Sequence, residues 1–268
     1  MHAGIATIAL RNYDVFTALD IAAQAGFAGV EIWGKPPHIP EGVDEEHIRR
    51  IRDRACANGI KIPIFGSYVN PSWPEYEAKS DEAIKIALRL GAKIIRVWAG
   101  NKEPDAAEQD LWEHVAGSLR EFALRAEYEG LQLAIEMHSD TLCYTAKGAK
   151  RVLEIADAPS LKLNYQVGDF ANPDVDNDIS LVGDQIIMGH AQNFVASTYK
   201  PGSLVRSLVR DGNVDYDRVL SLLSERGFNG YVEVEFVKDE EISEDAMMES
   251  LKNDAQYLIE LTKRYSKG

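Results

Sequence analysis

Short runs of β-branched and apolar residues alternate with longer stretches of helical spacing along the whole chain. In the stretches 111–126 and 247–258, apolar residues recur every three or four positions, which is the period of one helix face. Between the sixth and seventh apolar runs, the segment Asn172–Leu181 is too short and polar to predict a full helix. The apolar runs predict eight strands, near Ile5–Ala9, Gly29–Trp33, Lys61–Ser67, Lys93–Ala99, Leu131–Met137, Leu161–Gln166, Gln185–Gln192 and Tyr231–Phe236.

Glycines and serines mark several predicted helix ends. A glycine just before a strand suits the left-handed residue that ends a helix, and a serine before a helical run suits an N-cap. The candidate C-terminal glycines are Gly26, Gly59, Gly91, Gly130 and Gly227, and the candidate N-caps are Ser80 and Ser243.

Strict alternation of eight strand–helix units predicts an α/β fold with a parallel sheet and right-handed crossovers. The length of 268 residues is typical of one closed barrel of this kind. The chain contains neither the G-x-G-x-x-G nor the G-x-x-x-x-G-K-[ST] pattern, so a nucleotide-binding fold would lack its phosphate-binding loop. We therefore predict a single (β/α)8 TIM barrel over residues 1–268.

The net charge and composition restrict which classes of partner the protein can bind. The formal net charge is −14, which repels nucleic acid and anionic lipid. No apolar run approaches the ~20 residues of a membrane helix, and the N-terminus lacks the basic region of a signal peptide. Cys56 and Cys143 are too few for a disulfide framework and predict two buried, reduced thiols. We expect a cytoplasmic protein with a small-molecule substrate and no nucleic-acid or membrane partner; a homo-oligomer or a partner subunit stays open.

Alternation along the strands assigns polar residues to the barrel lumen, because successive side chains point to opposite faces. In the fifth strand Leu133 and Ile135 face the helices, so Glu136 and then His138 face inward. The same parity turns a set of polar and aromatic residues inward on the other strands: Glu31, Trp33, Arg96, Trp98, Lys162, Asn164, Gln166, His190, Gln192, Tyr231, Glu233 and Glu235.

Four inward residues come last on consecutive strands: Glu136, Gln166, His190 and Glu235. They should meet at the C-terminal rim, where barrel enzymes carry out their chemistry. Two carboxylates, an imidazole and an amide oxygen suit one divalent ion, Mn2+, Mg2+, Co2+ or Zn2+. The alternative is a metal-free network of hydrogen bonds and ion pairs around Arg96 and Lys162.

Other residues near the rim are candidates for substrate contact. The planar guanidinium of Arg96 suits a substrate oxyanion or carboxylate, the alternative being an ion pair with a rim glutamate. Trp33, Trp98 and Tyr68 could form an apolar wall for a sugar, or simply pack. The long connection Phe194–Asn213 carries Lys200, Arg206 and Arg210, and such connections are often lids or substrate contacts, although a plain surface loop is also consistent.

Several segments together resemble the xylose isomerase-like barrel superfamily, nearly throughout the chain. They are Gly29–Gly34 (Gly-x-Glu-x-Trp-Gly), Ile95–Gly100, Glu136–His138 (Glu-x-His) and Gly230–Glu235. This superfamily includes sugar phosphate isomerases and epimerases, inosose dehydratases and 3-dehydroshikimate dehydratases. The resemblance implies one metal held from strands five to eight, here by Glu136, Gln166, His190 and Glu235.

One ligand position departs from that pattern. The family usually has Asp where this chain has Gln166, which removes a negative charge although the amide oxygen is still a competent ligand. Asp169, three residues further on, is a candidate to compensate.

The resemblance implies a divalent-metal-dependent isomerase or epimerase of a sugar or polyhydroxylated ketone. It would remove an α-proton through a metal-stabilised enediolate, with Glu136 and Glu235 as ligands and proton shuttles. The second hypothesis is a lyase, 3-dehydroshikimate dehydratase-like or cleaving another C–O or C–C bond, with His138 as base. The third is a metal-free, partner-dependent or non-catalytic barrel, suggested by Gln166. The abasic-site endonuclease branch uses more histidines than the six present, and the acidic charge opposes it.

Overall fold

The computed structural model describes residues 1–266, and in it eight parallel strands close into a barrel. The strands follow one another around the barrel in chain order, and the last one, β10, closes it against β1. The barrel strands are β1 (His2–Ala6), β2 (Gly29–Trp33), β3 (Lys61–Val69), β4 (Ile94–Val97), β5 (Gln132–Glu136), β6 (Leu161–Tyr165), β7 (Ile186–Ala191) and β10 (Tyr231–Val234). The predicted TIM barrel is confirmed.

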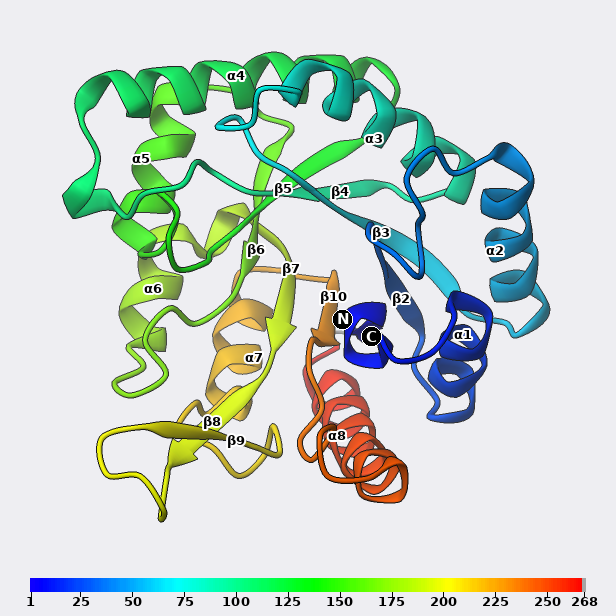
Figure 1. The fold of residues 1–268 in the computed structure, drawn as a ribbon. Helices are drawn as coiled ribbons and strands as arrows, with labels where there is room; N and C mark the ends of the chain where they lie inside the picture. Colours follow the sequence, from blue (N-terminus) through cyan, green and yellow to red (C-terminus); the bar gives the residue numbers. More distant parts are fainter. Residues whose placement is uncertain (267–268) are drawn as a thin grey trace.

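Eight α-helices of the described chain lie outside the strands, as Figure 1 shows. Each buries one apolar stripe against the barrel, in keeping with the three-to-four-residue spacing of its sequence. They are α1 (Val15–Gln24), α2 (Glu45–Ala57), α3 (Tyr76–Leu90), α4 (Gln109–Tyr128), α5 (Ala146–Ala156), α6 (Val175–Val182), α7 (Tyr216–Glu225) and α8 (Glu244–Tyr265).

The predicted helix ends are largely confirmed. All five candidate glycines have positive φ, and the Ser243 side chain caps α8 by accepting from the Ala246 N–H. Ser80 was wrong as an N-cap, because α3 begins four residues earlier. Its hydroxyl donates to the Glu77 carbonyl one turn back, as serines inside helices do.

Three local expectations need correction. The first strand is His2–Ala6 instead of Ile5–Ala9, because Thr7–Leu10 form a 3-10 helix. A short apolar sequence does not reveal whether it forms a strand or a buried helical turn. The polar segment after the sixth strand does form a short helix, α6, which Asp174 caps. Cys143 is buried as expected, but Cys56 is exposed on α2.

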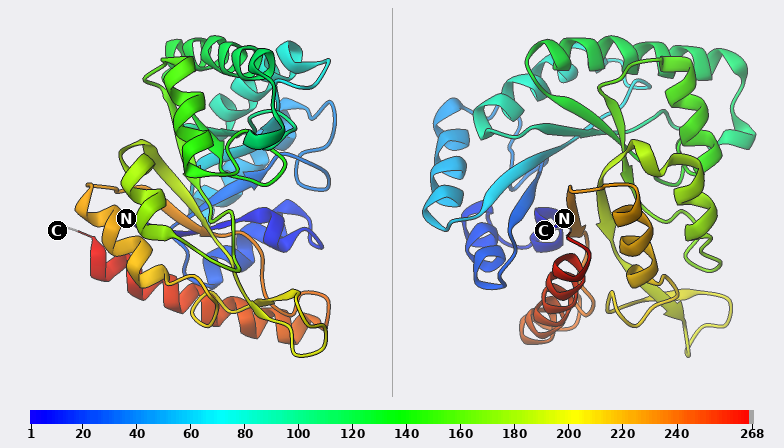
Figure 2. Two further views of the ribbon diagram at one scale, coloured as in Figure 1. Left: turned by 90° about the vertical axis from the view of Figure 1, so that its left-hand side faces the viewer. Right: turned by 180° about the vertical axis from the view of Figure 1, so that it is seen from behind.

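The connection after β7 forms an antiparallel hairpin that the sequence did not predict. Its strands are β8 (Asn193–Ala196) and β9 (Leu204–Ser207). Figure 2 shows this hairpin on the side of the molecule opposite the N-terminus. It therefore stands at the end of the barrel to which the C-terminal ends of the strands point.

The lumen is layered. A small apolar cluster of Ile64, Ala134 and Met188 lies inside the barrel, separate from the large core between strands and helices. Next to these residues in the sheet register stand Glu31, Arg96 and the other buried charged side chains. Since burying unpaired charge is costly, these groups must pair with one another or bind something. Across residues 1–266, no helix combines the length and apolar composition that crossing a bilayer requires.

Candidate active site

His190, at the end of β7, occupies the centre of the charged layer and contacts carboxylates with both ring nitrogens. Its Nε2 lies 2.9 Å from Glu31 Oε2. Its Nδ1 lies 3.1 Å from Glu136 Oε1 and 3.5 Å from Glu235 Oε1. Burial alone would lower the pKa of His190, but the charges of Glu235 and Glu31 raise it well above its ordinary value. Without a metal, the ring is thus held between carboxylates from three other strands.

Arg96 joins two of those carboxylates. Its Nε donates to Glu31 Oε1 at 2.7 Å and its Nη1 donates to Glu136 Oε2 at 2.5 Å. The guanidinium is 1% exposed and lies 4.3 Å from the Tyr68 ring centroid. A bidentate substrate contact, one prediction for Arg96, would have to displace these ion pairs. The network expected as the alternative is present around Arg96, but Lys162 is not part of it, because it donates to Gln185.

The two rim glutamates differ in proton affinity. Burial would raise the pKa of Glu136, but the charge of Arg96 and the hydrogen bond to His190 hold it well below its ordinary range. Burial raises the pKa of Glu235 to about 7, against the opposing charge of His190. Two carboxylates that face the same nitrogen of one imidazole thus have pKa values displaced in opposite directions, an arrangement that suits acid–base chemistry.

Three of the four predicted metal ligands come together. One ligand atom from each of Glu136, His190 and Glu235 lies within 4.8 Å of the others. Gln166 is also buried, and its Oε1 has no hydrogen-bond partner among residues 1–266. Buried acceptors are rarely left unpaired, so this oxygen is available to a ligand. The donor set of two carboxylates, one imidazole and one amide oxygen therefore fits a divalent ion.

Asp169 does not compensate for Gln166 as suggested. It is exposed, and its Oδ1 accepts the backbone N–H groups of Ala171 and Asn172. A side chain that closes its own turn in this way is directed away from the cluster.

A second acidic group lies on the other side of His190. Glu31, His190 and Glu233 also have ligand atoms within 4.8 Å of one another. Burial and the charge of Glu31 raise the pKa of Glu233 well above its ordinary value. Arg96 pairs with one carboxylate of each group, Glu31 in this one and Glu136 in the first. The alternation of side chains along the strands predicted that Glu31 and Glu233 face inward, but it assigned no role to them.

His138 and Trp98 lie beside Glu136. Trp98 Nε1 donates to Glu136 Oε2 at 2.5 Å, and the indole stacks on the His138 ring with centroids 4.8 Å apart. His138 Nδ1 lies 2.7 Å from the Ser139 carbonyl oxygen, so the neutral ring takes the tautomer with its proton on Nδ1 and its lone pair on Nε2. Trp33 instead packs edge-on against His38. Of the three predicted wall residues, Trp98 and Tyr68 contact each other.

The β8–β9 hairpin reaches the cluster through one residue. Gln192 Nε2 donates to Glu235 Oε2 at 2.7 Å, and its Oε1 accepts from Arg206 Nη1 at 2.9 Å. Arg206 was predicted to lie near the substrate because it is on a long connection, whereas the bridging role of Gln192 was not predicted. The predicted inward direction of the Gln192 side chain was the signal that could have indicated it. Lys200 is exposed at the turn of the hairpin.

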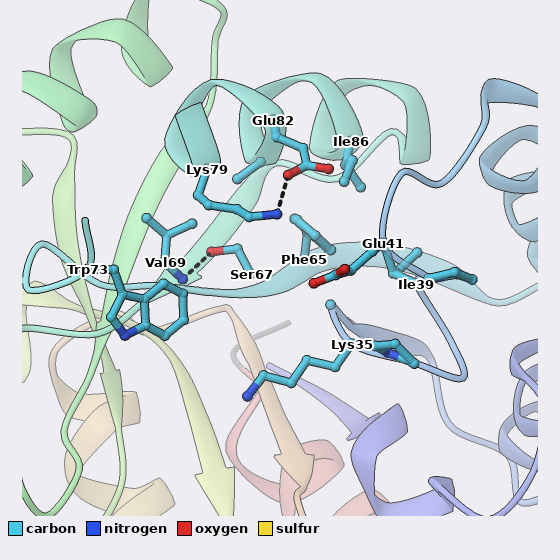
Figure 3. Close-up of a pocket in the computed structure, with 14 residues that line it drawn as sticks. Lys35, Ile39, Glu41, Phe65, Ser67, Val69, Trp73, Lys79, Glu82 and Ile86 are labelled. Carbon is cyan, nitrogen blue, oxygen red and sulfur yellow. Dashed lines mark hydrogen bonds and ion pairs between the residues drawn. The ribbon is translucent and has the colours of Figure 1, made fainter. Parts of the chain in front are cut away.

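A cavity of about 280 Å3 lies beside the mouth, between the segment after β2 and helix α3 (Figure 3). Its walls are mostly apolar, and its Lys79 and Glu82 pair with each other at 2.9 Å. Lys35 lines this cavity and also lies 4.5 Å from the Tyr68 ring centroid. The His190 cluster does not line it, so the cavity adjoins the candidate site without containing it.

The sequence of this chain matches one known protein family over most of its length. Residues 19–260 match the family described as "Xylose isomerase-like TIM barrel". The chain belongs to this family. The family assignment agrees with the motifs in β2, β4, β5 and β10, and with the closed barrel.

Individual relatives differ in the reaction they catalyse. A mannonate dehydratase of Shouchella clausii (strain KSM-K16) is 29% identical over 143 residues, which cover 48% of this chain and only 39% of that protein. A fructoselysine 3-epimerase of Escherichia coli O157:H7 is 23% identical, and the match covers 88% of this chain and 90% of the epimerase. The solved structure of the IolI protein with a bound zinc atom superposes with a TM-score of 0.82 at 17% identity, covering all of both chains. Epimerases and dehydratases are thus both among the relatives.

Proposed function

We propose that this protein is a divalent-metal-dependent isomerase or epimerase acting on a sugar or polyhydroxylated ketone. The observation that supports this best is the Glu136–His190–Glu235 cluster at the barrel mouth, with carboxylates of opposite pKa displacement. Glu136, Gln166, His190 and Glu235 would hold one Mn2+, Mg2+, Co2+ or Zn2+ ion. The full-length similarity to an epimerase supports the same class of reaction.

Each residue has a part in such a reaction. A bound divalent ion would supply Lewis-acid stabilisation of the negative charge that develops on substrate oxygens. Glu235 takes the α-proton at a carboxylate oxygen and returns it in the second half of the reaction. Glu136, which faces the same nitrogen of His190 as Glu235 does, is the second proton shuttle. Trp98 forms a wall beside the reacting carbons, and Arg96 holds Glu136 in place.

A lyase is the second candidate, favoured by the position of His138. The Nε2 lone pair is free to accept a proton, since Nδ1 is engaged by the Ser139 carbonyl. In this version His138 takes the α-proton, and Glu235 protonates the departing hydroxyl. The partial match to a dehydratase supports this alternative.

Metal content is the first test. Protein purified without chelator, and its Glu136→Gln and Gln166→Asp variants, would be analysed by inductively coupled plasma mass spectrometry. We expect near-stoichiometric Mn, Mg, Co or Zn in the wild type and in Gln166→Asp, and its loss in Glu136→Gln. The exposed Glu113→Gln is the matched control and should keep its metal.

Wild-type protein without metal, even after reconstitution, would contradict the proposal. If Gln166→Asp then regained metal, the third hypothesis of a metal-free, partner-dependent or non-catalytic barrel would replace it. For a metal-loaded protein, candidate ketoses in deuterated water separate the two reactions. Deuterium incorporation without elimination indicates the isomerase, and loss of water indicates the lyase.

A further inference from the structure

Arg206 is a cation at the barrel mouth that contacts no carboxylate directly among the described residues. It lies on β9, with its guanidinium carbon 5.0 Å from the Phe194 ring centroid and 4.6 Å from that of Phe236. Among residues 1–266 its one hydrogen bond goes to the neutral amide of Gln192. The charges of Glu240, Glu235 and Glu241 act on it from farther away, and none of these carboxylates forms an ion pair with it. Burial lowers the pKa of this guanidinium, which reports the cost of removing it from water.

Lys35 is a second cation of this kind, at the end of β2. Its ammonium stands over the Tyr68 ring, and Tyr68 in turn contacts Arg96 and Trp98. Within the described chain it takes part in no ion pair, and in Figure 3 no interaction joins it to the other residues of the cavity. Burial and the charge of Arg96 lower the pKa of Lys35.

The surroundings of Tyr68 are built with unusual backbone. Tyr68 itself has a φ of 59°, which is uncommon for a bulky residue. The pairing of β3 with β4 shifts register between Gly66 and Val69, which directs the Tyr68 ring toward Lys35 and Arg96. Such conformations concentrate where a side chain must be held for function.

A half-buried cation without a carboxylate in direct contact lowers stability unless a ligand supplies the anion. The chain as a whole has a net charge of −14, so it had ample carboxylates with which to pair these two groups. We infer that the substrate is an anionic polyhydroxylated compound, whose carboxylate or phosphate ester is bound by Arg206 and drawn by the positive charge of Lys35. This inference rests on the proposed function for where the reaction occurs, and it adds the charge class of the substrate.

The link through Gln192 makes Arg206 a suitable point of attachment. Gln192 donates to Glu235 and accepts from Arg206, so the anion site is two hydrogen bonds from a proposed proton carrier. The planar guanidinium keeps further N–H donors free for a bidentate contact with a carboxylate or phosphate. A charged group bound here would anchor the hydroxylated part of the molecule over the cluster.

Calorimetric titration with three matched probes tests the inference. Sorbitol, gluconate and sorbitol 6-phosphate share a hydroxylated chain and differ in their charged group. Titrations use the protein as purified and again after EDTA treatment, so that coordination of a carboxylate to metal is separated from binding to Arg206. We expect at least one anionic probe to bind tenfold or more tightly than sorbitol in both states. Whether gluconate or the phosphate ester binds better identifies the anion.

Variants locate the effect. Arg206→Gln should reduce the preference for the anionic probe about tenfold, Lys35→Gln should reduce it less, and Arg206→Lys should restore part of it. Arg210→Gln, an exposed arginine of the same segment, should leave it unchanged. The inference is overturned if the neutral and anionic probes bind equally, if none binds, or if the preference disappears with EDTA. A protein that binds no metal even after reconstitution, but still prefers the anion, would contradict the proposed function alone.

Discussion

His190 determines how the candidate site is arranged, because its two nitrogens face different carboxylates. With Nε2 donating to Glu31, Nδ1 is the nitrogen that faces Glu136 and Glu235 and that would bind the proposed metal. Metal-binding histidines commonly donate their other N–H to a carboxylate in this way, which sets both tautomer and orientation. Glu31 therefore acts as a positioning residue for the proposed ligand, and Arg96 positions Glu31.

Replacing Glu31 with Gln should weaken metal binding without removing a ligand. The amide oxygen can still accept from His190, but the lost charge reduces the basicity of the ring and releases one partner of Arg96. We expect a 10- to 100-fold lower Mn2+ affinity, measured by competition with a fluorescent chelator. Glu113→Gln serves again as control. Unchanged affinity in a folded Glu31→Gln protein would show that Glu31 only neutralises Arg96.

At the scale of elements, the β8–β9 hairpin is fastened to the barrel at its base. The Asn193 side chain donates to the carbonyls of Val209 and Val214, both at 2.8 Å. Asp254 on α8 accepts the Val209 N–H at 2.7 Å, while its other oxygen has no partner within residues 1–266. These bonds hold the strand that carries Arg206, so α8 contributes indirectly to the geometry of the mouth.

Asp254 should make stability depend on pH. Burial raises its pKa to about 7, so the folded protein retains a proton that the unfolded chain releases above about pH 4. Stability from this group is therefore greatest below about pH 4 and falls as the pH rises to about 7. Asp254→Asn, neutral at every pH and still able to accept from Val209, should be the more stable protein at pH 8, by up to ~4 kcal/mol.

Urea denaturation at pH 5 and pH 8 would measure this difference. The advantage of Asp254→Asn should be much smaller at pH 5, and the exposed Asp110→Asn should show no such change. An advantage equal at both values would mean that repacking, and not the proton, explains the effect.

For the whole molecule, the closed barrel brings together groups that are remote in sequence. The cluster draws Glu31 from β2, Arg96 from β4, Glu136 from β5, His190 from β7, and Glu235 from just after β10. A metal bound here would connect strands on several sides of the barrel, and it would bind only the folded state. Binding and global stability should therefore be linked.

Added metal should raise the melting temperature. A Mn2+ concentration one hundred times the dissociation constant stabilises the folded state by about 2.7 kcal/mol, which corresponds to several degrees for a protein of this size. Differential scanning calorimetry in Mn2+ and in EDTA would measure the shift. The same shift in Glu136→Gln would place the metal elsewhere on the protein.

The sequence alone determined the barrel and most of the site. Burial has a local signature, period two in strands and about 3.6 in helices, so the eight units could be recognised along the chain. The same parity turned Glu136, His190 and Glu235 inward, and order along the strands put them at one end. Gln166 was visible as a departure through the resemblance to the family, which usually has Asp at that position.

Only the tertiary structure decided how the inward groups pair. Arg96 and Glu31 are 65 positions apart in the chain, and His190 and Glu31 are 159 apart. Parity places such groups in one lumen, but which atoms meet depends on the stagger of the strands and on rotamers around the closed ring. For that reason the engagement of Arg96 by two carboxylates, the bridge of Gln192 to Arg206, and the turning away of Asp169 became visible only in three dimensions.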